Sequence, residues 1–205
     1  MREVKMKAHR RIAWLAGVAM LAGCASGPPL PPKVAIAFQK ETLLVPAGAI
    51  SLVDNYKPPL VSPNVEQNHE TRPAHIPRRW IDARTKAIAG APGAITLTVS
   101  DASVVEQPLE VKTDWKHALS RQAEKKLTAN LAWRLSYDGP QLNWTADGTA
   151  TSTQTVLEES SLNEADADYN AMIEALAAAF DGKLAQQLGE LRAALASVGA
   201  PVPRR

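Results

Sequence analysis

Cysteine and histidine are scarce in this chain of 205 residues, which has one cysteine, Cys24, and four histidines. A single cysteine excludes a disulfide within the chain. The histidines that follow Cys24 are His69, His75 and His117, and none has the spacing of a metal ligand. The sequence also lacks a His-Glu-x-x-His motif. We therefore expect no metal centre and no other cofactor.

Sequence motifs of common catalytic and nucleotide sites are also absent. Residues 90–93, Gly-Ala-Pro-Gly, match neither a phosphate loop nor a dinucleotide fingerprint, and the sequence has no Gly-x-Ser-x-Gly elbow. Asp101 is the most isolated acid on a predicted strand, where a bulge or a strand end accounts for it better than catalysis does. These absences predict a protein that is not an enzyme.

The longest apolar run near the start of the chain is only 11 residues, from Ile12 to Ala22. A helix needs roughly 20 apolar residues to cross the hydrocarbon core of a bilayer. Five basic residues and one acid precede the run, which is the layout of a signal peptide. Residues 1–23 are therefore predicted to be a signal peptide that is removed from the mature protein.

The run ends in Leu21, Ala22, Gly23 and Cys24, and these four residues resemble the lipobox of bacterial lipoprotein signal peptides at every position. The resemblance implies cleavage before Cys24 and attachment of lipid, including fatty acyl chains such as palmitate, to this residue. Two or more acyl chains anchor a protein stably to a membrane. A free, buried cysteine beside a simple cleavage site is the alternative interpretation.

The residues after Cys24 bear on the membrane to which the lipid would hold the protein. In the usual sorting rule of bacterial lipoproteins, an Asp directly after the cysteine retains the protein in the inner membrane. Here Ala25 and Ser26 follow. The resemblance therefore implies a cell-envelope protein held at the outer membrane, facing the periplasm.

The basic charge of the chain belongs largely to the signal peptide. Without residues 1–23, the remaining 182 residues carry 18 basic and 20 acidic side chains, a net charge of −2. A nucleic-acid-binding domain normally carries a concentrated basic surface. We therefore expect no nucleic-acid partner.

Residues 24–76 are predicted to be a lipidated tether and a proline-rich arm, because ten of the 15 prolines lie between Pro28 and Pro77. Short strands are indicated at 34–38 and 50–53. The stretch 55–73 fits either a flexible linker or a segment that docks on a partner or wraps the domain. Both interpretations stay open, since apolar Leu60, Val61 and Val65 are unusual in a spacer.

Residues 77–197 are predicted to form one α+β domain, with a mostly antiparallel sheet and two helices packed on one face. Strict alternation of apolar and polar residues indicates strands at 95–105, 126–137 and 142–157, of which the last two form a hairpin. Apolar residues at helical spacing indicate a helix at 77–89, whose other face carries Arg78, Arg79, Arg84 and Lys86 and is taken as solvated. Residues 198–205 are expected to be a loose tail.

A second, longer helix is predicted at 162–196. Ser161 and Glu164 have the capping-box spacing, and a long apolar stripe follows. The stripe comprises Tyr169, Met172, Ile173, Leu176, Phe180, Leu184, Leu188 and Leu191. It fits a helix that covers the apolar face of the sheet better than one that forms a coiled-coil seam.

This order of helices and strands behind a lipobox resembles a group of small Gram-negative envelope lipoproteins. The group includes the auxiliary lipoprotein of ABC-type lipid transporters and the lipopolysaccharide-assembly lipoprotein. Three sequence pieces also look like parts of an uncharacterised lipoprotein family: residues 56–59, Trp80 with Arg84, and residues 101–104. The resemblance supplies no active residue.

Two functions are compatible with these features. In the first, the protein is a non-catalytic accessory subunit of envelope assembly or lipid transport, which binds an envelope protein through an exposed sheet edge or through the arm. In the second, it carries a lipid or glycan in a cavity between helices and sheet. Small Ala146, Gly148 and Ala150 are the residues that would leave room for such a ligand.

Overall fold

A computed structural model describes residues 36–109, 123–157 and 160–200, which belong to a single compact unit, Pro31–Arg205. Its helices and strands follow the order β1 (Leu43–Val45), β2 (Ala49–Asp54), the 3-10 helix η1 (Glu66–Asn68), α1 (His75–Arg84), β3 (Thr85–Ala87), β4 (Ala94–Asp101), β5 (Val104–Pro108), β6 (Ala123–Asp138), β7 (Asn143–Leu157) and α2 (Leu162–Ser197). The predicted lipobox, Leu21 to Cys24, lies outside the described residues, as do His117 and most of the predicted tail.

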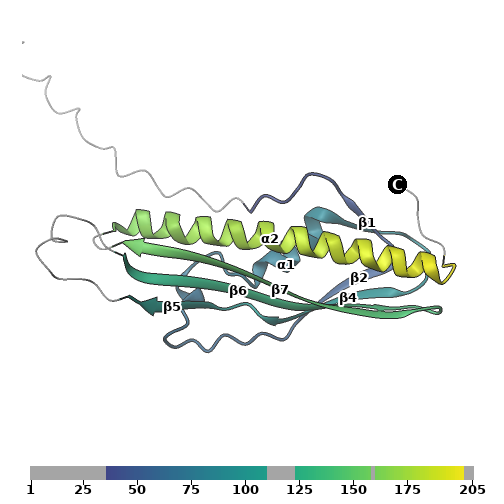
Figure 1. The fold of residues 1–205 in the computed structure, drawn as a ribbon, viewed down its shortest axis with the longest axis horizontal. Helices are drawn as coiled ribbons and strands as arrows, with labels where there is room; N and C mark the ends of the chain where they lie inside the picture. Colours follow the sequence, from purple (N-terminus) through teal and green to yellow (C-terminus); the bar gives the residue numbers. More distant parts are fainter. Residues whose placement is uncertain (1–35, 110–122, 158–159, 201–205) are drawn as a thin grey trace, which may run out of the picture. The chain divides into compact units, whose positions relative to one another are not determined.

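Strand β6 is the centre of a five-stranded sheet (Figure 1). Its whole length pairs with β7 as an antiparallel hairpin. On its other side, the later part of β6 pairs with β4 and the earlier part with β5, both antiparallel. β2 adds to β4 in parallel and forms an edge of the sheet. β1 and β3 form a separate two-stranded parallel sheet.

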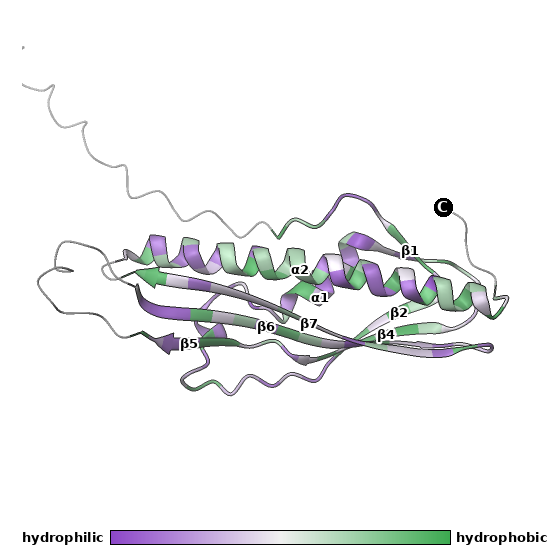
Figure 2. Ribbon diagram, viewed as in Figure 1, coloured by the Kyte–Doolittle hydropathy of each residue, from purple (hydrophilic) through white to green (hydrophobic). Residues whose placement is uncertain are grey.

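Alternation along the strands produces one packed and one polar sheet face, as the sequence predicts. Leu131, Trp133 and Leu135 of β6 are buried, whereas Arg134 between them is exposed. On β7 the odd-numbered residues are exposed. Figure 2 shows the resulting mixture of hydrophobic and hydrophilic residues along these strands and around α2.

Both helices pack on the apolar face of this sheet, which confirms the predicted α+β fold. Phe180 of α2 meets Trp80 of α1 and Trp133 of β6 edge-on, with ring centroids 5.9 Å and 4.8 Å apart. All eight residues of the apolar stripe predicted for α2 are buried. The capping box is also present, because the Ser161 hydroxyl accepts from the Glu164 amide while the Glu164 carboxylate accepts from the Ser161 amide.

Two predicted helix and strand boundaries are wrong. The first helix begins at His75 and ends at Arg84, and residues 85–87 pair with β1 instead of continuing the helix. The predicted strand 95–105 is two strands, since the register of β4 shifts between Val99 and Asp101 and β5 begins at Val104. The Asp101 carboxylate accepts a hydrogen bond from the Ser103 amide, 3.1 Å away, which stabilises this break. Asp101 is therefore a strand-end residue next to a bulge, as expected.

The proline-rich arm is part of the folded unit. β2 confirms the strand indicated at 50–53, while residues 36–38 form no strand. The Val65 amide donates to the Val104 carbonyl (2.9 Å) and the Glu106 amide donates to the Pro63 carbonyl (2.9 Å), so the arm runs along β5. Of the two interpretations of residues 55–73, the structure supports the segment that wraps the domain. The sequence places the start of the domain at residue 77, but its first strands lie before that position.

Candidate binding surface

A buried carboxylate, Glu66, locks the arm to the break between β4 and β5. Its side chain is 1% exposed and accepts hydrogen bonds from the Tyr56 hydroxyl (2.5 Å) and the Val104 amide (3.1 Å). Burial raises the pKa of Glu66, but these hydrogen bonds outweigh that effect and hold its pKa below the ordinary value. Burial and the Glu66 carboxylate raise the pKa of the Tyr56 hydroxyl. The ionised Glu66 thus acts as a structural acceptor.

His69 and Thr71 fix the next part of the arm to the start of α2. The His69 ring stacks on Tyr169 with centroids 3.5 Å apart, and the Tyr169 hydroxyl donates to the Thr71 carbonyl at 3.0 Å. Burial lowers the pKa of His69, and Asp166, 3.9 Å away, opposes that shift only in part. The neutral ring therefore suits the stacked position.

A second buried carboxylate, Asp181 of α2, joins three parts of the chain. It accepts hydrogen bonds from the Trp80 indole (2.7 Å), from Arg84 Nε (2.8 Å) and from the Gln39 amide (3.0 Å). Arg84 and Asp181 form an ion pair whose side chains are 2% and 3% exposed. The interpretation of Arg84 as part of a solvated basic face is therefore wrong, although Arg78 and Arg79 are exposed.

These two networks contain residues from each of the three sequence pieces noted above. Tyr56 and Val104 meet at Glu66, and Trp80 and Arg84 meet at Asp181. The sequence pattern alone did not predict either carboxylate as a buried structural residue. Asp181 was detectable in principle, since it occurs on the same helical stripe as Ala177 and Leu184, where a charge needs a partner.

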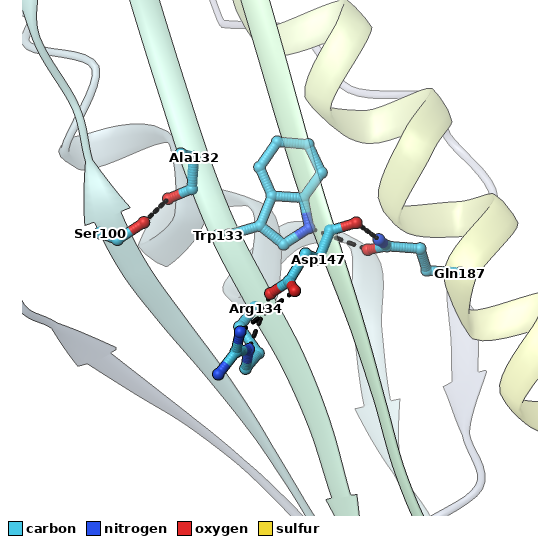
Figure 3. Close-up of polar contacts among 6 residues, drawn as sticks. All are labelled: Ser100, Ala132, Trp133, Arg134, Asp147 and Gln187. Atoms are coloured by element: carbon cyan, nitrogen blue, oxygen red, sulfur yellow. Dashed lines mark hydrogen bonds and ion pairs between the residues drawn. The ribbon is translucent and has the colours of Figure 1, made fainter.

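Gly148 of β7 lies directly under the Trp133 ring. Figure 3 shows the Trp133 indole beside β7, donating to Gln187 of α2 (2.8 Å), while Gln187 donates to the Asp147 carbonyl (2.9 Å). A Cβ atom on Gly148 would overlap the Trp133 ring. The indole thus occupies the space over Gly148 that was considered for a ligand.

The opposite side of the sheet is covered by hydroxyl and amide side chains, and we call it the polar face. The strand registers place its members on one side of β4, β6 and β7. They include Thr96, Thr98, Thr128, Asn130, Ser136, Thr145, Thr149, Thr151, Thr153 and Thr155. Neither α1 nor α2 packs on this face, because both cover the apolar one. It is therefore the broad surface that the described residues leave open.

The polar face carries one balanced ion pair. Arg134 of β6 and Asp147 of β7 are cross-strand partners, joined by bonds of 2.7 Å and 3.1 Å (Figure 3). Their side chains are 61% and 70% exposed. Hydrogen bonding to Arg134 lowers the pKa of Asp147. Such a pair orients the two side chains but contributes little to the free energy of folding, because solvent screens the charges.

Within the described ranges, no group of three or more His, Cys, Asp or Glu residues is arranged to hold a metal ion. In the same part of the chain, no helix combines the length and the apolar character needed to span a membrane.

The structure thus defines a small α+β protein in which the arm covers the outer edge of β5 and the polar sheet face stays open.

No protein-family model matches the sequence, and no curated protein matches it. Among solved structures, rare lipoprotein B from Shewanella oneidensis is 9% identical and aligns over 72% of this chain and 98% of its own, with a TM-score of 0.41. A DUF330 protein from Xanthomonas campestris is 12% identical and aligns over 76% and 96%, with a TM-score of 0.35. Because these scores are low, we base the function on this chain's own residues.

Proposed function

We propose that this protein is a non-catalytic binding subunit of the cell envelope and that lipid on Cys24 holds it at the outer membrane. In this proposal, the protein docks on an envelope protein through its polar face. The partner would take part in envelope assembly or lipid transport. The sequence left two candidates for partner binding, an exposed sheet edge and the arm. The observation that carries the proposal is that the contacts of the arm through Glu66, His69 and Thr71 are made within the protein, while the polar face stays open among the described residues.

The chemistry of the polar face agrees with a binding role. Threonine hydroxyls on rigid strands are short, so they lose little conformational entropy when a partner covers them. Each hydroxyl can donate and accept, which suits recognition of backbone and polar side chains. The Arg134–Asp147 pair adds a fixed donor and acceptor set without net charge.

Site-specific photo-crosslinking in the native bacterium tests this proposal. A photoreactive residue replaces Thr151 or Thr153 on the polar face, and the control replaces Ala178 on the exposed side of α2. We expect one discrete protein adduct from the polar-face positions and none from the control. Addition of Thr128→Arg, on the strand next to Thr153, should remove the adduct while the melting temperature stays unchanged. Equal adducts from both surfaces, or none from the polar face, would contradict the proposal.

A further inference from the structure

Two edges of the five-stranded sheet are protected by other parts of the protein. Arm residues 63–65 bond to β5, as described above. On β7, Gln187 and Lys183 of α2 donate to the outward carbonyls of Asp147 (2.9 Å) and Thr149 (2.5 Å). Natural proteins protect edge strands in such ways because an open edge pairs readily with another strand.

The outer edge of β2 has no comparable protection. Among the described residues, no backbone group pairs with this side of the strand. Residues 49–53 contain neither a charge nor a proline, and Val53 is 41% exposed. Ile50 and Leu52 face the core but are only half-buried, whereas their partners Ile95 and Leu97 on β4 are 0% exposed. The apolar layer therefore ends abruptly at β2.

The orientation of the β2 backbone follows from the hydrogen bond after its last residue. The Asn55 amide donates to the Val99 carbonyl at 2.9 Å, so odd-numbered residues here turn their amides toward β4. Backbone groups alternate sides along a strand. The amides and carbonyls of Ile50, Leu52 and Asp54 consequently point outward, where a new strand would bond.

We propose that β2 pairs antiparallel with β2 of a second copy of this chain, with Ser51 of one copy opposite Ser51 of the other. This register joins the outward groups of Ile50 and Leu52 across the two-fold axis. It continues the apolar layer, because Ile50 faces Leu52, and on the opposite side of the sheet Ala49 faces Val53. Asp54, the one charge in the strand, falls opposite Gly48.

Shifted registers are poorer. Centring the pair on Leu52 places Asp54 opposite Ile50, which sets a charge against an apolar side chain. A shift by one residue moves each side chain to the wrong sheet face.

The self-complementary arrangement has the two-fold symmetry of a closed dimer. A single pair of short strands makes a small interface, so we expect a weak dimer that crosslinking detects better than gel filtration does.

Disulfide crosslinking provides a test with a specified register. The mature chain, residues 24–205, carries Cys24→Ser, so that each introduced cysteine is the single thiol. In Ser51→Cys, the two thiols face each other at a non-hydrogen-bonded pair, where Cα atoms are about 4.5 Å apart. That separation lies within the range of disulfides. We expect a covalent dimer on mild oxidation and no dimer from the control Thr153→Cys.

Two further variants test the register itself. Ala49→Cys and Val53→Cys should each stay monomeric alone and should form a mixed disulfide when combined. Adding Ser51→Lys to that mixture should abolish the mixed disulfide, because two lysines then face each other, while the melting temperature is unchanged. The dimer is excluded if Ser51→Cys crosslinks no more than Thr153→Cys, or if Ala49→Cys crosslinks alone as well as in the mixture. Such a failure leaves the polar-face proposal intact, because that proposal is measured at other residues.

Discussion

Two aspartates of this protein each pair with an arginine, but one pair is buried and the other is exposed to solvent. Asp181 and Asp147 each pair with an arginine at 2.8 Å and 2.7 Å, respectively. Asp181 is buried, so its charge depends on its partners, whereas Asp147 is solvated on the polar face. Removing one partner of a buried pair leaves an uncompensated charge, and an exposed pair is worth little.

Matched Asp→Asn substitutions should separate these two roles. Asp181→Asn removes the counter-charge of Arg84, and we expect the free energy of unfolding to fall by about 3–5 kcal/mol. Asp147→Asn should leave the midpoint of urea denaturation unchanged. Urea titrations of the two variants and the parent chain at pH 7 measure both effects. Equal midpoints for the two variants would show that the buried pair contributes no more to the free energy of unfolding than the exposed pair does.

At the scale of helices and strands, the sequence correctly predicts the elements that have a regular apolar alternation or a helix cap. The β6–β7 hairpin and α2 lie within a few residues of their predicted bounds, because each has a long, regular pattern. The errors occur where long-range contacts override the local pattern. α1 ends at Arg84 because residues 85–87 pair with β1, and Glu66 of the arm binds the Val104 amide directly after the break between β4 and β5.

The arm contact should be visible as a pH dependence of stability. The pKa of Glu66 is lower in the folded protein than in the unfolded chain, so its contribution is present above pH 4.5. This contribution is lost as the pH falls through the folded value. Glu66→Gln removes the charge and replaces one carboxylate oxygen with an NH2 donor, so the bonds from Tyr56 and Val104 lose their charge-assisted acceptor. We expect lower stability at pH 7 and a flatter loss of stability below pH 4.5, measured by urea denaturation at several pH values.

The control for this change is Glu70→Gln, at an exposed position on the same segment. It should follow the parent chain at every pH. A Glu66→Gln protein whose stability keeps the full acid dependence of the parent would rule out the structural role assigned to this carboxylate.

For the whole molecule, the sequence predicts a cell-envelope location and the fold class, but not the surface that is proposed to bind a partner. Cys24 has a motif around it, whereas the polar face is a set of threonines spread over residues 96–155 that only the strand registers bring together. The alternation predicts which sheet face is packed, but it does not indicate which sheet edge is left open, because that depends on where the arm runs.

The predicted anchor has a direct test. Cys24→Ser should stay unlipidated and uncleaved, because the thiol that is predicted to carry the lipid is missing. Metabolic labelling with a fatty acid, followed by gel analysis of size, measures both properties. Ala25→Gly is a conservative control that should be labelled and processed normally. Normal labelling of Cys24→Ser would refute lipidation at this residue.

The contacts of residues 39–66 limit how far the chain can be shortened. A fragment beginning at residue 77, where the sequence suggests a domain, would lose β2 and would leave the Val104 amide without the Glu66 carboxylate. It would also remove the Gln39 amide from Asp181 and uncover Ile95 and Leu97, which β2 covers in the intact protein. Recombinant versions intended for binding studies should therefore begin no later than Ile36.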